Sequence, residues 1–133
     1  MGSVRNIVNY RLLSLSYKDP KNIRSILKSW GGLESLSLKG DAVATCILAD
    51  MKRVTGIEPD KYNRYNRTEF NLGYLSGKLS HYQYMSIAYT LVLGYSQAEV
   101  AWVMGVDQSV VSKNINSGIK KIQKELRAHL EED

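Results

Sequence analysis

Residues that cross-link a chain or break its helices are scarce in this sequence. Its 133 residues include one cysteine, Cys46, and two prolines. A lone cysteine forms no disulfide within the chain and no cysteine-rich zinc site. Cys46 stands in the apolar run AVATCILADM, which predicts a small buried side chain rather than a reactive thiol. The apolar fraction of 44% is ordinary for a folded protein and excludes disorder along the whole chain.

Catalytic patterns are also missing. The two histidines, His81 and His129, are too far apart to suggest a metal site or a catalytic dyad, and no glycine-rich phosphate loop is present. Asp41 and Asp50 are nine residues apart on one expected helix, whereas neighbours on a helix face are three or four apart. We therefore expect no enzyme, no cofactor and no metal.

Long apolar runs are absent as well. No stretch approaches the length of a membrane span, and no signal peptide opens the chain, so we expect a cytoplasmic protein with no membrane partner. The formal net charge of +5 suggests a polyanionic partner. Charge alone leaves nucleic acid, lipid and acidic proteins open.

The spacing of apolar residues predicts an all-α fold. A stripe over residues 4–15 indicates a first helix that ends before Asp19. Asp19 is the expected cap of a second helix with Pro20 at its first position, and Gly31-Gly32 is its expected end. Asp41 is the expected cap of a third helix, whose inward positions are Ala44, Ile47, Leu48, Met51 and Val54.

The pattern weakens over residues 56–79, which we interpret as a linker or hinge. Thr68 with Glu69 indicates a short helical turn, and the glycines at 73 and 77 are expected to punctuate the segment. Basic and aromatic residues interleave at its start: Lys61, Tyr62, Arg64, Tyr65 and Arg67. Such a mixture can stack on bases and grip phosphates, or its tyrosines can simply pack on neighbouring helices.

Stronger signals begin at Ser80, the expected cap of a helix that ends at Gly94. Ser96 and Glu99 have the spacing of a capping box and open a short helix that ends at Gly105. Asp107 then caps a last helix over about 108–130, roughly 35 Å long.

Two helices joined by a short glycine-containing turn predict a helix-turn-helix, so the fold class is all-α with a C-terminal three-helix module and a long last helix, preceded by N-terminal helices. Ala101 fits the close approach of the two helices, and Val106 is expected to anchor the turn. The core of the pair is expected to draw on these side chains: Val100, Ala101, Val103, Met104, Val111 and Ile115.

This arrangement leaves short polar side chains on the outer face of the last helix, suited to base edges in a major groove. The candidate base-reading residues are Gln108, Ser109, Ser112, Lys113 and Asn116. Basic residues continue along the helix as candidate phosphate contacts: Lys120, Lys121, Lys124 and Arg127.

The segment YSQAEVAWVMGVDQSVVSKNINSGIKKI resembles the helix-turn-helix of sigma factor region four, and resembles even more the phage-encoded sigma-like regulators that include the ArpU-related late-gene regulators. The resemblance covers residues 80–127, with a looser likeness in GDAVATCILADM. It implies transcriptional control in a bacterial host cell, with double-stranded DNA as partner and contact to RNA polymerase. By position it implies base contacts from Gln108, Ser109, Ser112 and Lys113 and a phosphate near Ser96 and Gln97.

The chain departs from the family at Asn114, Asn116 and Gly118, where sigma-like reading helices usually carry more arginine, and it has no segment for melting a promoter. An accessory activator or repressor is therefore expected rather than a complete sigma factor.

Alternatives remain open at this level. Steps of four and three indicate a short seam in the last helix, which either makes a homodimer or docks the N-terminal helices: Ile115, Ile119, Ile122, Leu126 and His129. A phage DNA-packaging protein of the terminase small-subunit kind would also carry such a module, and so would a protein that holds RNA polymerase without reading DNA. We expect three regions: an N-terminal helical region over 1–55, the linker over 56–79 and a DNA-binding domain over 80–133.

Overall fold

The computed structural model describes residues 17–63 and 65–132, with the backbone alone for residues 129–132. Within these ranges the chain is helical and contains no strand, which confirms the all-α expectation. The helix expected over 4–15 lies outside the described residues. In chain order the elements are α2 (Pro20–Lys28), α3 (Trp30–Leu38), α4 (Ala42–Thr55), η1 (Pro59–Lys61), α5 (Arg67–Asn71), η2 (Gly73–Ser76), α6 (His81–Ile87), η3 (Ala88–Val92), α7 (Gln97–Met104) and α8 (Gln108–Glu132).

Helix α2 begins as the sequence predicts. Asp19 Oδ1 accepts the backbone N–H of Lys21 at 2.9 Å, and Pro20 occupies the first helical position, where its missing N–H costs nothing. Ile23 and Leu27 are fully buried on the inner face of the helix. The cap and the apolar spacing together therefore fix both the start of α2 and the side that packs.

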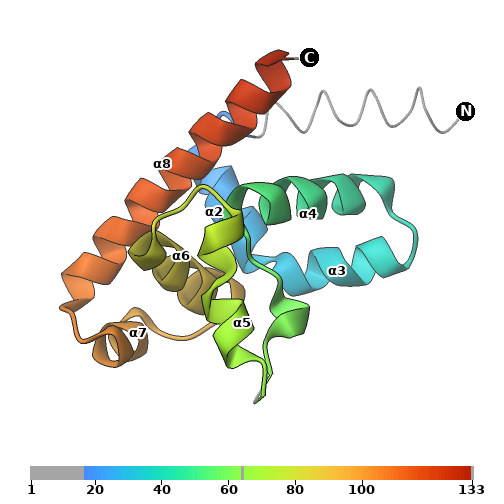
Figure 1. Ribbon diagram of the computed structural model, residues 1–133. Helices are drawn as coiled ribbons and strands as arrows, with labels where there is room; N and C mark the ends of the chain where they lie inside the picture. Colours follow the sequence, from blue (N-terminus) through green and yellow to red (C-terminus); the bar gives the residue numbers. More distant parts are fainter. Residues whose placement is uncertain (1–16, 64, 133) are drawn as a thin grey trace, which may run out of the picture.

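The expectation that the second helix ends at Gly31-Gly32 is wrong, because α2 already ends at Lys28 and α3 then runs through both glycines. A Cβ added to either glycine would meet nothing within 4 Å, so neither is required by a turn or a close contact. Burial of Trp30 and the packing of α3 along α4 outweigh the low helix propensity of glycine. Figure 1 shows α3 and α4 side by side as a pair.

Helix α4 matches the sequence expectation in its cap and its core face. Asp41 Oδ1 accepts the backbone N–H of Ala44 at 2.9 Å, and Gly56 ends the helix in the left-handed conformation with φ +77°. Every expected inward side chain is buried: Ala44, Ile47, Leu48, Met51 and Val54. Cys46 is only half-buried, so its expected burial is met in part.

The segment 56–79, interpreted from sequence as a linker or hinge, is packed in this structure. Ile57, Phe70 and Leu79 are buried in the same core as the flanking helices. The backbone also passes close to itself here, since a Cβ on Gly77 would lie 2.4 Å from the carbonyl carbon of Thr55. The glycines of this segment therefore permit close packing as well as turning the chain. Helix α5 supplies the short helical turn expected at Thr68 and Glu69.

Helix α8 is the longest element and runs along one side of the molecule, with α7 near its beginning (Figure 1). It contacts α2, α4, α6 and α7. The apolar seam expected on α8 is buried within the chain: Ile115, Ile119, Ile122 and Leu126. The seam therefore docks the helices of its own chain, which is one of the two alternatives left open by the sequence. The side chain of His129 lies outside the described residues.

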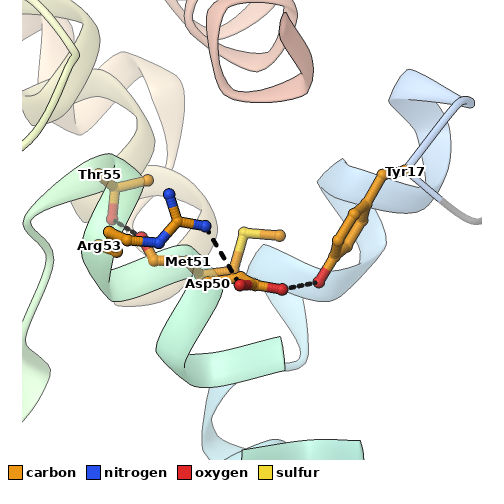
Figure 2. A network of polar contacts seen from close by, with 5 residues as sticks. All are labelled: Tyr17, Asp50, Met51, Arg53 and Thr55. Carbon is orange, nitrogen blue, oxygen red and sulfur yellow. Dashed lines mark hydrogen bonds and ion pairs between the residues drawn. The ribbon is translucent and has the colours of Figure 1, made fainter. Parts of the chain in front are cut away.

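A buried carboxylate ties the start of the described chain to α4. Asp50 accepts a hydrogen bond from the Tyr17 hydroxyl at 2.9 Å and a charged one from Arg53 at 3.2 Å (Figure 2). Thr55 Oγ1 donates to the carbonyl of Met51 and accepts the backbone N–H of Ile57, which stabilises the end of α4. Among the described residues, no helix is both long and apolar enough to cross a membrane.

Candidate nucleic-acid interface

The platform of the candidate interface is α6 with its continuation η3. Ser80 and Gln83 form a capping box at the start of α6, with distances of 3.2 and 3.0 Å. The sequence predicts a single helix up to Gly94, whereas the structure changes to a π-helical turn over Ala88–Val92 before Gly94 reverses the chain with φ +84°. Ala88 and Leu91 of this turn are buried.

Helix α7 begins with the predicted capping box. Ser96 Oγ accepts the N–H of Glu99 at 3.1 Å, and the Glu99 carboxylate accepts the N–H of Ser96 at 3.2 Å. Val100 and Ala101 are buried, as expected. The expectation that Val103 joins the core is wrong: its side chain is 73% exposed, because the buried stripe of this two-turn helix runs along the Val100, Ala101 and Met104 side.

The turn between α7 and α8 is short and geometrically defined. Gly105 adopts φ +69°, the left-handed conformation in which a Cβ is disfavoured, and the N–H of Val106 donates to the carbonyl of Ala101 at 3.0 Å. Val106 packs half-buried against the core. Val111 and Ile115 are fully buried, and they fix the first turns of α8 against α7 and α6.

A close helix crossing explains the glycine at position 118, where the sequence departs from the sigma-like pattern. A Cβ on Gly118 would lie 2.4 Å from Ile87 Cδ1 of α6. Gln83 Nε2 of α6 also donates to Ser117 Oγ at 3.1 Å. The missing side chain at position 118 therefore leaves room for the Ile87 side chain where α6 packs against α8.

The predicted base-reading residues lie on that exposed side. Gln108, Ser109, Lys113 and Asn116 are exposed and Ser112 is half-buried. Further along the helix, Lys120, Lys124 and Arg127 are exposed, at spacings of four and three that keep them on one side. Lys121 differs from them, because it is half-buried and forms an ion pair with Glu125 at 3.5 Å.

Two predicted contacts have partners inside the protein. Asn116 Oδ1 accepts a hydrogen bond from Arg24 Nη2 at 2.8 Å, which holds the amide toward α2. The N–H of Ser96 is taken by Glu99, so a carboxylate stands at the helix start where the resemblance implies a phosphate near Ser96 and Gln97. A carboxylate there competes with an anionic ligand for the end of the helix dipole.

Sequence reasoning missed the basic residues that α2 brings to this side of the molecule. Lys21 and Arg24 line a hollow of about 340 Å³ together with Asn116 and Lys120 of α8. Lys21, Arg24 and Lys28 are spaced by three and four on α2, so their shared face is readable from the sequence. Their position beside α8 cannot be read from the sequence, because it depends on packing between segments 92 residues apart.

An aromatic groove of about 560 Å³ lies between the 56–79 segment and α7. Its lining includes Tyr62, Tyr89, Tyr95, Met85, Trp102 and Val103. Trp102 is 84% exposed. The hydroxyls of Tyr62 and Tyr95 share a hydrogen bond of 2.9 Å, and the Arg67 guanidinium lies 5.7 Å from the centre of the Tyr62 ring.

The residues of the basic-aromatic segment 61–67 therefore differ in how far they pack against the rest of the protein. Tyr62 packs edge-on against Phe70 and Tyr89, as in the packed alternative for this segment. Lys61 forms an ion pair with Glu58 at 3.4 Å, and Tyr65 is 89% exposed. Arg64 lies outside the described residues.

Burial and neighbouring tyrosines change the acidity of this cluster. Burial is the main reason that the pKa of Tyr84 is raised far above its usual range, with smaller contributions from Tyr89 and Glu58. Burial also raises the pKa of Tyr89, whereas the hydrogen bond with Tyr62 raises that of Tyr95. These hydroxyls stay protonated at neutral pH, so they act as hydrogen-bonding groups and not as acids.

Among the described residues, no group of three or more histidine, cysteine, aspartate or glutamate side chains is arranged to hold a metal ion.

Comparison with known proteins gives no match: no family model, no curated protein and no solved structure matches this chain.

Proposed function

We propose that the chain is a sequence-specific DNA-binding transcription regulator of phage or prophage origin, in which α6, α7 and α8 form a sigma-like helix-turn-helix. In this proposal the first turns of α8 enter the major groove, where Gln108, Ser109, Ser112 and Lys113 read base edges. Lys120 and Lys124 meet the phosphate backbone. The role is that of an accessory activator or repressor that contacts RNA polymerase.

One observation carries the proposal: a capped two-turn helix, a left-handed Gly105 turn and a long helix whose exposed side is polar first and basic afterwards. The buried Val111 and Ile115 fix the opposite side, so these polar groups have a defined orientation. A solvated helix face needs neither the tight turn nor the basic continuation. A reading helix uses both, the turn to project the helix and the lysines to hold the backbone.

The test is selection of bound fragments from a random duplex pool near physiological salt, with wild type and Lys113→Ala in parallel. Wild type should enrich one motif. Loss of a direct base contact by Lys113→Ala should weaken binding to that motif by about 1–3 kcal/mol and change the preferred base at one position. The matched control is Lys39→Ala, since Lys39 is an exposed lysine at the end of α3. If Lys113→Ala and wild type select the same motif with the same affinity, Lys113 does not belong to the reading face. If wild type enriches no motif, the proposal is wrong.

The aromatic groove favours a second candidate function, docking on a protein such as RNA polymerase without reading DNA. Trp102 and Val103 are large apolar side chains left exposed beside it, and aromatic residues of this kind anchor protein interfaces. If this candidate holds, Trp102→Ala should weaken binding to purified bacterial RNA polymerase at least tenfold, a typical hot-spot loss of about 1.4 kcal/mol or more. Tyr65→Ala, which removes an exposed aromatic outside the groove lining, is the control. Equal polymerase binding by Trp102→Ala and wild type would contradict it.

A further inference from the structure

Helix α2 is fastened along the side of α8 that borders the proposed reading face. Arg24 Nη2 donates to Asn116 Oδ1 at 2.8 Å. About two turns further along α8, Gln123 Nε2 donates to the backbone carbonyls of Tyr17 and Lys18. Arg24 and Gln123 thus hold α2 and the residues that lead into it against α8, and α2 also buries Ile23 and Leu27.

The attachment brings together positive charges from two distant parts of the sequence. Lys21 and Arg24 of α2 and Lys120 of α8 line one hollow of about 340 Å³, next to the amide of Asn116. The hydrogen bond from Arg24 uses the oxygen of that amide, so its NH₂ group keeps its donors. Every polar side chain that lines the hollow therefore presents N–H groups, and three of them carry a full positive charge.

No acidic side chain neutralises this group. Among the described side chains, no ion pair involves Lys21, Arg24 or Lys120. Asp19, at the start of the same helix, accepts the backbone N–H of Lys21 as the helix cap. Like charges lining one hollow repel one another, and an anion bound between them removes that repulsion.

The position along α8 indicates which anion fits. Lys113 and Lys120 are seven residues apart, a rise of about 10 Å, and the major groove is about 12 Å wide. When the first turns of α8 lie in the groove, the hollow therefore lies beside the sugar-phosphate backbone at the edge of that groove. The hollow lies on the same side of α8 as the reading residues, because Asn116 at its edge is three residues from Lys113.

We propose that the hollow formed by Lys21, Arg24, Asn116 and Lys120 binds one backbone phosphodiester of the target DNA, flanking the groove that α8 enters. Helix α2 is then a second DNA-contacting element, and Asn116 positions a phosphate donor instead of reading a base. This inference rests on the proposed DNA-binding function and adds a partner contact to it.

The first experiment compares Lys21→Gln with the control Lys39→Gln, which removes an exposed lysine at the end of α3. Binding to the selected motif and to a scrambled duplex is measured from 50 to 300 mM salt. Losing one phosphate contact should weaken both duplexes by roughly fivefold near 0.15 M salt and lower the salt slope by about 0.9. Lys39→Gln should match wild type.

The second experiment neutralises single phosphates of the duplex with methylphosphonates. One flanking position should weaken wild type but leave Lys21→Gln unchanged, which identifies the phosphate that occupies the hollow. If wild type binds its motif and Lys21→Gln behaves as Lys39→Gln at every position, the inference is overturned while the proposed function stands. If wild type binds no duplex DNA, both are overturned.

Discussion

At the scale of single residues, buried polar groups explain part of the stability. Asp50 is a largely buried carboxylate, and burial of a charge is costly unless donors surround it. Tyr17 supplies one donor from a residue 33 positions away, and Arg53 supplies the other from the next turn of α4. The Asp50 contact therefore links α4 to the segment that leads into α2.

We expect Tyr17→Phe to lower the free energy of unfolding by about 1–3 kcal/mol. The substitution keeps the buried ring and removes the O–H donor, and hydrogen bonds to charged groups contribute in this range. Urea unfolding followed by circular dichroism measures the change.

The control for this prediction is Tyr65→Phe, which removes the hydroxyl of a tyrosine that is 89% exposed and should leave the midpoint unchanged. An equal midpoint for Tyr17→Phe and wild type would mean that the Asp50 carboxylate does not depend on this donor.

At the scale of elements, the glycines fall into two classes with opposite expected responses. Gly32 is a helical position in α3 where an added Cβ meets nothing, whereas Gly77 faces the backbone of Thr55 at 2.4 Å. A methyl group has free space at the first and displaces main chain at the second.

Gly32→Ala should raise the free energy of unfolding by about 0.5–1 kcal/mol. Alanine loses less backbone entropy than glycine when it joins a helix, and no contact in α3 opposes the added methyl group. A shift of the thermal midpoint to higher temperature would show this gain, and a lower midpoint would mean that the backbone of α3 is not helical at position 32.

Gly77→Ala should lower the free energy of unfolding by about 1–3 kcal/mol, the usual cost of overpacking a dense contact. The same thermal measurement applies, with Gly32→Ala as the matched substitution. A stability equal to that of wild type would show that the backbone of the 56–79 segment moves to accept the methyl group, as expected of a linker.

The sequence predicted helix starts better than helix ends. Asp19, Asp41 and Ser96 cap helices as expected, because a cap depends on side chains only two or three positions apart. The predicted helix end at Gly31-Gly32 is wrong, because α3 is stabilised by packing on α4, and local helix propensity does not take that packing into account.

At the scale of the whole molecule, the candidate interface was only half predictable. The exposed side of α8 followed from its 3.6-residue period, since Gln108, Ser109 and Lys113 are where the pattern places them. The contribution of α2 depends on the Arg24–Asn116 contact across 92 residues, for which one sequence holds no signal. The exposed Trp102 was missed for a related reason, because a two-turn helix has too few positions to define its buried side.

The tyrosine cluster makes a prediction about the whole fold. The chain has nine tyrosines and one phenylalanine, and many of these rings meet between the 56–79 segment and α6. The Tyr84 hydroxyl donates to the carbonyl of Phe70, and that of Tyr89 to Asn71. Burial of these rings disfavours the charged phenolate, so folding and tyrosine ionisation oppose each other.

We expect the free energy of unfolding to fall as pH rises above about 10, the ordinary tyrosine pKa. Since folding raises the pKa of Tyr84, Tyr89 and Tyr95, the unfolded chain loses these protons first. The stabilisation is complete below the unfolded pKa and is lost as pH increases toward the folded one. Urea midpoints at pH 8, 9, 10 and 10.5 measure the slope. Tyr84→Phe should begin at a lower midpoint, having lost the bond to Phe70, but should fall less steeply, because one raised pKa is gone. Lysine deprotonation affects both proteins equally, so equal slopes would contradict the link between Tyr84 ionisation and folding.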